Sequence, residues 1–295
     1  MFDLEELRIA AETGVTEAQN FLASLYLEGN ENPQIEQDIN LAVEWFEKAV
    51  QLGSKVAMVK LGEVYCYGEY GVVDTTRGIL LLEQAAKMGD NVAMGDLGFI
   101  YSKGIGVEED KERGLGYFIK AAQNGNIAAM HLLACLYKNG DGVEPDVDRA
   151  NYWMKKEEIY RKFEAVYPEI EVLSKEGNQA IEDDNLDYAI ECFQNALNLI
   201  PEPREEFSAT TWLYAGLGDV YFIQDEYDTS LEYFMRAYNE NEDYSNPYVL
   251  YMMGKCYYEL DNVIKAKEFL KQAYMLVGED IFQGDNQKYI NLVER

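Results

Sequence analysis

The feature that most constrains this chain is an internal repeat in its first half. A leucine, a small residue and then a tyrosine recur every 36 residues, in the segments Leu61-Gly62 to Tyr65, Leu97-Gly98 to Tyr101, and Leu133-Ala134 to Tyr137. A second series with the same period is Gly53, Gly89 and Gly125. A fixed period of this length is typical of solenoids, in which one unit cannot bury its apolar face and neighbouring units stack to form the core.

The spacing inside one unit predicts a pair of helices. Ala57, Leu61 and Tyr65 are four residues apart, so they form one stripe of a helix. The small residue beside this stripe lets a second helix approach closely. Gly-x-Gly turns, such as residues 104–106, supply the positive φ angles that a tight turn needs, and Gly53 lies where a left-handed helix C-cap belongs. We therefore expect an all-α fold of helix–turn–helix units stacked into an α-α superhelix.

Taken together, the repeated positions read A..LG..Y..G.GV..D...A..W..KA...G. This pattern resembles the Sel1-like repeat. Four copies cover roughly residues 14–160, the first of them carrying Leu22, Ala23 and Tyr26 and a longer loop over residues 30–34. The departures are small: Gly78 and Gly114 stand where other copies have alanine.

After Tyr160 the unit changes, and its glycine-rich turn becomes shorter. The new signature is a small residue three positions before another small or aromatic one, in Gly177-x-x-Ala180, Gly218-x-x-Tyr221 and Gly254-x-x-Tyr257. These segments resemble bacterial tetratricopeptide repeats. The spacings of 41 and 36 residues exceed the ideal of about 34, and loops over residues 201–207 and 243–247 account for the excess.

We accordingly expect two domains that join without a linker. They are residues 1–160, with about four Sel1-like repeats, and residues 161–295, with about three tetratricopeptide repeats and a capping helix over residues 281–294. Pro168 is expected to open a helix in its first turn. The superhelix is expected to be continuous, with a change of curvature near residues 155–172.

The net charge is −29, from 54 acidic and 25 basic residues. Residues 1–160 contribute −13 (14 − 27) and residues 161–295 contribute −16 (11 − 27), so the acidity is spread along the chain. Such a field disfavours nucleic acid and anionic lipid and favours a basic or amphipathic protein partner. The alternative is that the carboxylates only keep the surface soluble.

Several features point to a cytoplasmic protein without a membrane segment. No apolar run approaches the ~18–20 residues that span a bilayer, and the N-terminal segment is acidic rather than like a secretory signal. The four cysteines lie at least 57 positions apart, so no paired zinc-type motif exists. We expect a reducing cytoplasm and no metal or other cofactor.

Catalytic residues are scarce. His131 is the one histidine, and Cys135 follows it by one helical turn. A pair on one rigid helix does not by itself make an activated nucleophile, so we interpret it as structural or as part of a binding surface. Acidic clusters such as residues 108–110 and 182–184 lack the glycine and terminal glutamate of an EF-hand and are interpreted as solvated turns. We expect no enzyme.

Aromatic residues are the candidates for binding. Counted from the small residue of each motif, the positions that face a solenoid groove hold Tyr67, Phe99, His131, Trp212, Asp219, Phe222, Tyr248, Tyr251 and Tyr258. Exposed aromatic residues in a concave surface are common anchors of protein interfaces, although the same residues could instead pack against the next repeat. The tetratricopeptide resemblance also implies where a clamp of Lys, Arg and Asn for a chaperone C-terminus would lie. The matching positions hold Ser174, Asn178, Ala215, Asp219, Tyr251 and Lys255, so that clamp is essentially absent.

The predicted function is a scaffold that binds a partner polypeptide in its concave groove. The segment over residues 170–293, with Pro201, Pro203 and Trp212, looks like bacterial tetratricopeptide proteins from polymorphic-toxin immunity loci. That resemblance implies an acidic immunity protein that neutralises a basic toxin. The alternatives are a regulatory or signalling scaffold without a toxin and, more remotely, an enzyme.

Overall fold

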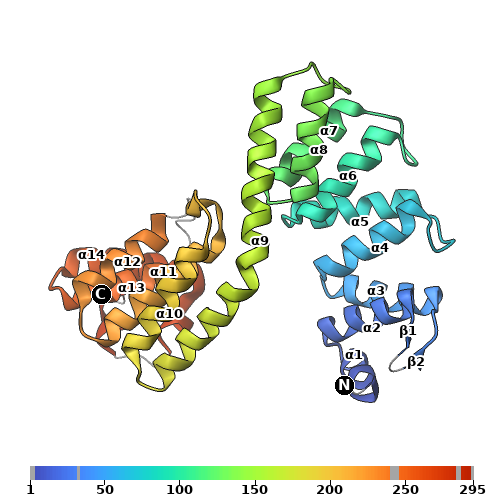
Figure 1. The fold of residues 1–295 in the computed structure, drawn as a ribbon. Coiled ribbons are helices and arrows are strands. Elements are labelled where there is room, and N and C mark those ends of the chain that lie inside the picture. Colours follow the sequence, from blue (N-terminus) through green and yellow to red (C-terminus); the bar gives the residue numbers. More distant parts are fainter. Residues whose placement is uncertain (1–3, 32–33, 240–245, 284–286, 294–295) are drawn as a thin grey trace. The chain divides into compact units, whose positions relative to one another are not determined.

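The structure is a computed structural model that describes residues 4–31, 34–239, 246–283 and 287–293. The chain divides into two compact units, residues 1–160 and 161–295, and each is described by itself. Helices dominate both units (Figure 1). None of the helices in these described ranges is both long and apolar enough to cross a membrane.

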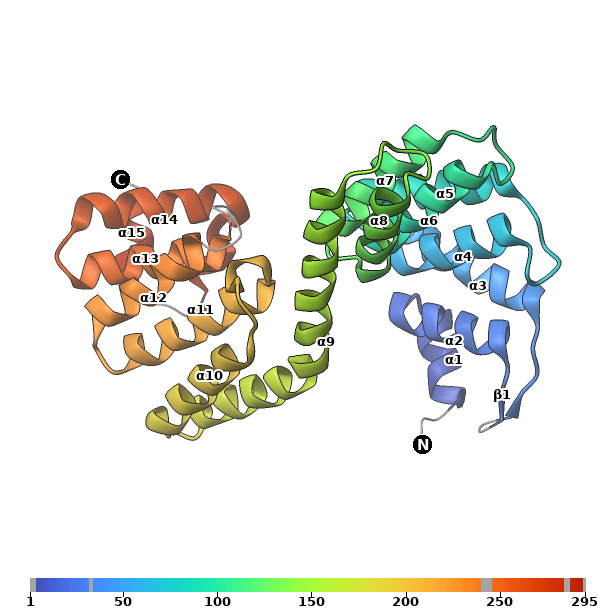
Figure 2. The same cartoon turned by 45° about the horizontal axis from the view of Figure 1, so that its top comes forward.

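The first unit is a row of short helices in which each helix packs against the next (Figure 2). Its helices are α1 (Leu4–Glu12), α2 (Thr16–Glu28), α3 (Ile39–Gln51), α4 (Lys55–Tyr67), α5 (Thr75–Lys87), α6 (Asn91–Lys103), α7 (Lys111–Gln123), α8 (Ile127–Asn139) and the first part of α9 (Val147–Glu182). Two-residue strands, β1 (Asn30–Glu31) and β2 (Gln34–Ile35), pair antiparallel in the longer first loop. The predicted helical solenoid is confirmed.

The ends of these helices follow from residues that recur with the repeat. Asp74 and Asp110 accept hydrogen bonds from the backbone N–H groups of Arg77 and Arg113, at 3.1 and 2.9 Å, and so cap α5 and α7. Gly104 closes α6 in the left-handed conformation, with φ +68°, as the Gly-x-Gly turn predicted. Asp74 and Asp110, which precede the second helices of their repeats, therefore serve as helix caps.

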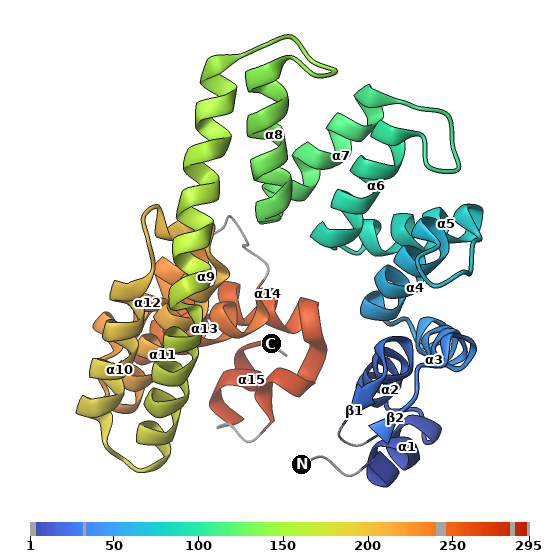
Figure 3. The same cartoon turned by 45° about the vertical axis from the view of Figure 1, so that its right-hand side comes forward.

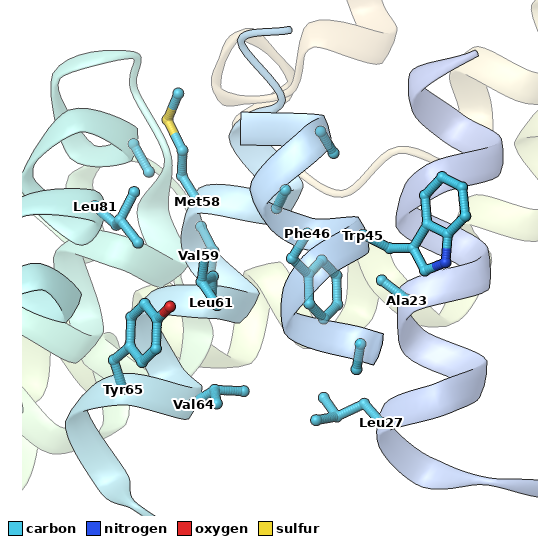
Figure 4. Close-up of a cluster of buried hydrophobic side chains, with 14 of the residues drawn as sticks. Ala23, Leu27, Trp45, Phe46, Met58, Val59, Leu61, Val64, Tyr65 and Leu81 are labelled. Carbon is cyan, nitrogen blue, oxygen red and sulfur yellow. The ribbon is translucent and has the colours of Figure 1, made fainter. Parts of the chain in front are cut away.

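The core of the first unit is built from the predicted apolar stripes. Phe46 and Leu61 are fully buried, and Figure 4 shows them between Ala23 on one side and Leu81 on the other. The small residues are close-contact positions, as predicted. A Cβ atom at Gly98 would lie 2.6 Å from the Phe118 ring, and one at Gly62 would lie 2.7 Å from Leu82.

The second unit contains the rest of α9 and a second set of paired helices (Figure 3). These are α10 (Leu186–Leu199), η1 (Arg204–Glu206), α11 (Ser208–Ile223), α12 (Tyr227–Asn239), α13 (Pro247–Glu259), α14 (Val263–Val277), η3 (Gly278–Phe282) and α15 (Gln287–Val293). Asp184, Asp225 and Asp261 take positive φ angles of 57°, 60° and 59° in the tight turns. Their spacings of 41 and 36 residues match those of the repeat.

Two local predictions were wrong. Pro168 does not open a helix; it lies inside α9, which runs unbroken from Val147 to Glu182. Proline removes one backbone hydrogen bond, and the other bonds of this long helix maintain it on both sides. The expected capping helix is shorter than residues 281–294: residues 278–282 form a 3-10 turn and α15 covers residues 287–293. Residues 284–286 and 294 of the predicted capping helix, and residues 243–245 of the predicted loop, lie outside the described residues.

Candidate functional site

The candidate residues lie on the first helix of each repeat, or close to its end. In the first unit these helices are α2, α4, α6 and α8, and in the second unit α11 and α13. Side chains of one first helix contact those of the next, and we call the surface that they form the first-helix face. Tyr67, Phe99 and His131 belong to it in the first unit, and Trp212, Asp219, Phe222, Tyr248, Tyr251 and Tyr258 belong to it in the second.

Tyr67 and Phe99 come together across α4 and α6. The two rings are 6.3 Å apart at an angle of 60°. The Tyr67 hydroxyl donates a 2.8 Å hydrogen bond to Oδ1 of Asp96, and within the described chain the buried Oδ2 of Asp96 has no hydrogen-bond partner. Burial raises the pKa of Asp96 to about 6 and also raises the pKa of Tyr67. Phe99 remains 43% exposed, so one ring of this pair faces solvent.

An acidic and aromatic hollow lies beside this pair, between α2 and α4. It has a volume of about 260 Å³, and its polar lining includes the carboxylates of Glu28, Glu63 and Glu69 and the rings of Tyr67 and Tyr70. We call it the acidic hollow. One cation also lines it: the ammonium of Lys60 forms a 2.9 Å ion pair with Glu63. The lining therefore carries three carboxylates against one ammonium, which favours a cationic side chain from a partner.

His131 lies one repeat further along, on α8. Its Nδ1 is 3.0 Å from Glu157 on α9, and its Nε2 is 3.8 Å from the Cys135 sulfur. This order of groups resembles that of a thiol nucleophile with its base and orienting acid. However, His131 and Cys135 lie in the interior of a helix, where backbone N–H groups are already bonded and cannot stabilise an oxyanion. The arrangement fits a surface contact better than a nucleophilic centre.

A second tyrosine–aspartate pair joins α11 and α13. The Tyr248 hydroxyl donates a 2.6 Å hydrogen bond to Asp219, and the two residues are 29 positions apart, as Tyr67 and Asp96 are. Burial raises the pKa of Asp219 to about 6, and the positive charge of Lys255 opposes that shift. Tyr248 is 44% exposed. A tyrosine–aspartate hydrogen bond between consecutive first helices thus occurs in both kinds of repeat, but the tyrosine lies on the earlier helix in the first unit and on the later helix in the second.

Two of the remaining candidates, Phe222 and Tyr251, lie beside Lys255. Its ammonium lies 4.8 Å from the Phe222 ring, 5.3 Å from Tyr251 and 5.2 Å from Tyr289 of α15. Tyr251 is buried, with its ring edge against Phe282. Tyr258 packs edge-on against Tyr289, and Trp212 is half-buried. The residues from η3 and α15 therefore cover much of α13. Tyr251 is buried, so it packs below the exposed residues and does not itself contribute exposed surface.

Several residues of this face were not predicted as binding candidates. Asp96, Glu28, Glu63, Glu69 and Tyr289 all line it or contact it. Asp96 could have been found, because it lies three residues before Phe99 and so shares a helix face with it. The contact between Tyr289 and Tyr258 could not have been predicted, because it depends on how the chain turns after α14.

Comparison with known families identifies both arrays. The Sel1 repeat family matches residues 16–54, 55–90, 91–126 and 127–156. The tetratricopeptide repeat family matches residues 213–244 and 247–276. Among curated proteins, none matches the sequence.

Solved structures similar to this chain are helical repeat proteins. One is c5321, a protective antigen of uropathogenic Escherichia coli strains with an SLR fold, at 22% identity and a TM-score of 0.49; the match covers 99% of this chain but only 63% of that one. A Sel1 repeat protein from Oxalobacter formigenes is 29% identical over 39% of this chain and 87% of its own, with a TM-score of 0.37. The immunity protein Pa5087 from Pseudomonas aeruginosa is 19% identical over 53% of this chain and 72% of its own, with a TM-score of 0.35.

Proposed function

We propose that this chain, which carries Sel1 repeats over residues 16–156 and tetratricopeptide repeats over residues 213–276, is a scaffold that binds a basic or amphipathic segment of another protein. The two repeat families indicate a protein-interaction scaffold. The finer proposal is that the partner binds the concave side of the solenoid, along the first-helix face. The observation that carries it is the acidic hollow, with three glutamates and two tyrosines around one paired lysine.

The chemistry of the hollow suits a lysine or arginine side chain. The carboxylates of Glu28, Glu63 and Glu69 can pair with a cation, and the rings of Tyr67 and Tyr70 can contact its aliphatic stem or its charge. The net charge of −29 would accelerate encounter with a basic partner. Because the acidity extends over both units, it supports a partner with an extended basic surface.

A finer form of this proposal makes the partner a basic toxin that this chain neutralises. The acidity of the chain supports it, because a toxin that acts on an anionic substrate has a basic site for an acidic surface to cover. The alternative is a regulatory scaffold that assembles cellular proteins through the same face. A toxin would form a 1:1 complex and lose its activity in it, whereas an assembled cellular protein would keep its activity.

The test is affinity capture with the full chain from cells of its native host, compared between two triple variants. The first replaces Glu28, Glu63 and Glu69 with glutamine. The control replaces Glu12, Glu108 and Glu112, which are exposed and lie outside the hollow, in the same way. We expect the first variant to lose the partner and the control to keep it. Equal binding by both variants would refute a role for the hollow.

The chain is also proposed to be non-catalytic, as is general for both repeat families. The substitution His131→Ala separates the two interpretations of the histidine. If the chain is a scaffold, this substitution should at most weaken partner binding, by an amount that depends on the interface area that His131 contributes. A complete loss of function with partner binding intact would instead indicate catalysis.

A further inference from the structure

A second hollow in the first unit differs in chemistry from the acidic hollow. It has a volume of about 120 Å³ and lies where α6, α7 and α8 meet the loop after α8. Its apolar and aromatic wall is formed by Phe99, Leu115, Phe118, Leu132, Leu136 and Val143. We call it the apolar hollow. Its size is of the order of the ~150 Å³ cavity that holds a benzene molecule in an engineered protein.

The repeat provides an internal comparison, because the equivalent place one unit earlier is occupied. Subtracting 36 from the lining residues Lys103, Leu132 and Leu136 gives Tyr67, Asp96 and Ile100. At that earlier junction Tyr67 is half-buried and packs against the hydrophobic core of the first unit. Its hydroxyl donates a hydrogen bond to Asp96. The chain thus supplies a phenol ring of its own between the second and third repeats.

At the next junction both partners of this arrangement are replaced. Lys103 stands where Tyr67 would be, and Leu132 stands where Asp96 would be. Lysine has no ring and the Lys103 side chain is exposed, so this residue does not fill the position that Tyr67 occupies one repeat earlier. The wall contributed by Leu115, Phe118 and Leu132 is left open as an apolar hollow.

The charges at the rim indicate what would accompany a ring. The ammonium of Lys111 is already paired with Asp141, at 3.1 Å. Within the part of the chain that the structure describes, Lys103 has no carboxylate at ion-pair distance. In a chain of net charge −29, this leaves a cation at the rim that a carboxylate can complement.

We propose that the apolar hollow receives an aromatic side chain of the partner, and that a carboxylate next to this side chain pairs with Lys103. This inference rests on the proposed function, since it names an anchor of the same partner on the same row of first helices. The partner segment then carries two kinds of contact: basic residues for the acidic hollow, and an acidic–aromatic pair for the apolar hollow.

The test uses two probes with the same phenol ring and opposite charges, 4-hydroxyphenylacetate and tyramine. Both are titrated into the full chain in about 150 mM salt, where long-range repulsion is screened beyond about 8 Å. Methyl NMR shifts of Leu115, Leu132 and Val143 report binding at the site. We expect saturable shifts with 4-hydroxyphenylacetate and up to about five-fold weaker binding of tyramine, the upper end of what one exposed ion pair contributes.

Two reciprocal variants use the internal comparison as a control. Lys103→Tyr with Leu132→Asp recreates the filled junction and should abolish binding of both probes. Tyr67→Lys with Asp96→Leu should open a second site one repeat earlier. Lys103→Met should remove the preference for the acidic probe without removing ring binding. Thermal melting of each variant verifies that it folds. If the second variant does not fold, the first and third variants still test the inference.

Equal binding of the two probes to the unmodified chain, or unchanged binding by the filled variant, would overturn this inference. A failure of this inference can be told apart from a failure of the proposed function. If the partner is captured through the acidic hollow but no probe binds here, only this inference fails. If the probes bind but the acidic hollow proves irrelevant to capture, the proposed function fails and the aromatic site remains.

Discussion

At the scale of single residues, the two tyrosine–aspartate pairs are the least ordinary feature of the structure. Asp96 and Asp219 are carboxylates held between helices of consecutive repeats, and each accepts a hydrogen bond from a tyrosine. Burial disfavours their charged form, so the pKa of each rises to about 6. Both positions therefore bind protons more tightly in the folded chain than in the unfolded one.

This difference predicts a pH dependence of stability. An unfolded aspartate has a pKa of about 3.9, so below that pH the raised folded pKa contributes its full stability, and the contribution is lost as the pH rises through about 6. We expect Asp96→Asn to reduce the fall in melting temperature between pH 4.5 and 7, and Asp219→Asn to do the same. The exposed residue Glu108 provides the control, as Glu108→Gln. Curves that stay parallel for all variants would contradict the burial of these carboxylates.

A second residue-scale prediction concerns the thiols. Cys66, Cys192 and Cys256 are buried, whereas Cys135 is half-buried beside His131 on the first-helix face. We expect a neutral thiol reagent to label one cysteine per native chain, and mass spectrometry to place the label on Cys135. Labelling should rise to four per chain in denaturant. Rapid native labelling at Cys66 would show that the first unit opens more readily than its packing implies.

At the scale of helices, the small residue of each motif sets how closely two helices pack. In Gly98→Ala the added Cβ would lie 2.6 Å from the Phe118 ring, so the substitution should destabilise the chain by about 1–3 kcal/mol. The control is Gly116→Ala on α7, where nothing lies within 4 Å and the helix should gain about 0.5–1 kcal/mol. Denaturant unfolding measures both. A neutral Gly98→Ala would mean that α6 and α7 are not packed as described.

Most of the helices could be predicted from sequence, and the exceptions have physical reasons. The 36-residue period, the capping aspartates and the glycine turns specify local structure, and the structure follows them from α2 to α8. The prediction that Pro168 opens a helix was wrong because a long helix tolerates one missing hydrogen bond. The burial of Tyr251 by Phe282 was not predictable, because it depends on a contact formed by the chain after the last repeat.

For the whole molecule, the sequence alone predicted the helical repeats and the acidic charge, and both support the proposal of a basic or amphipathic protein partner. What sequence could not provide is which groove positions are open, since the groove pattern of a repeat is the same whether its own side chains fill it or not. Tyr67 fills one junction and Lys103 leaves the next one open, and only the structure distinguishes them.

Charge predicts how the complex forms. With a net charge of −29, association with a basic partner should be steered at long range, and salt should screen this steering. We expect the association rate constant to fall about tenfold between 50 and 500 mM salt, with a smaller change in the dissociation rate. Stopped-flow measurement on the captured partner tests this. A rate constant independent of salt would show that the acidity serves solubility alone.

The central claim is that the partner lies along the first-helix face, and hydroxyl-radical footprinting of the captured complex tests it most directly. The account predicts that Tyr67, Tyr70 and Phe99 become protected from oxidation in the complex. Met88 and Met275, which are exposed and outside this face, should stay as reactive as in the free chain. Protection of the two methionines with unchanged reactivity of the three aromatic residues would contradict the account.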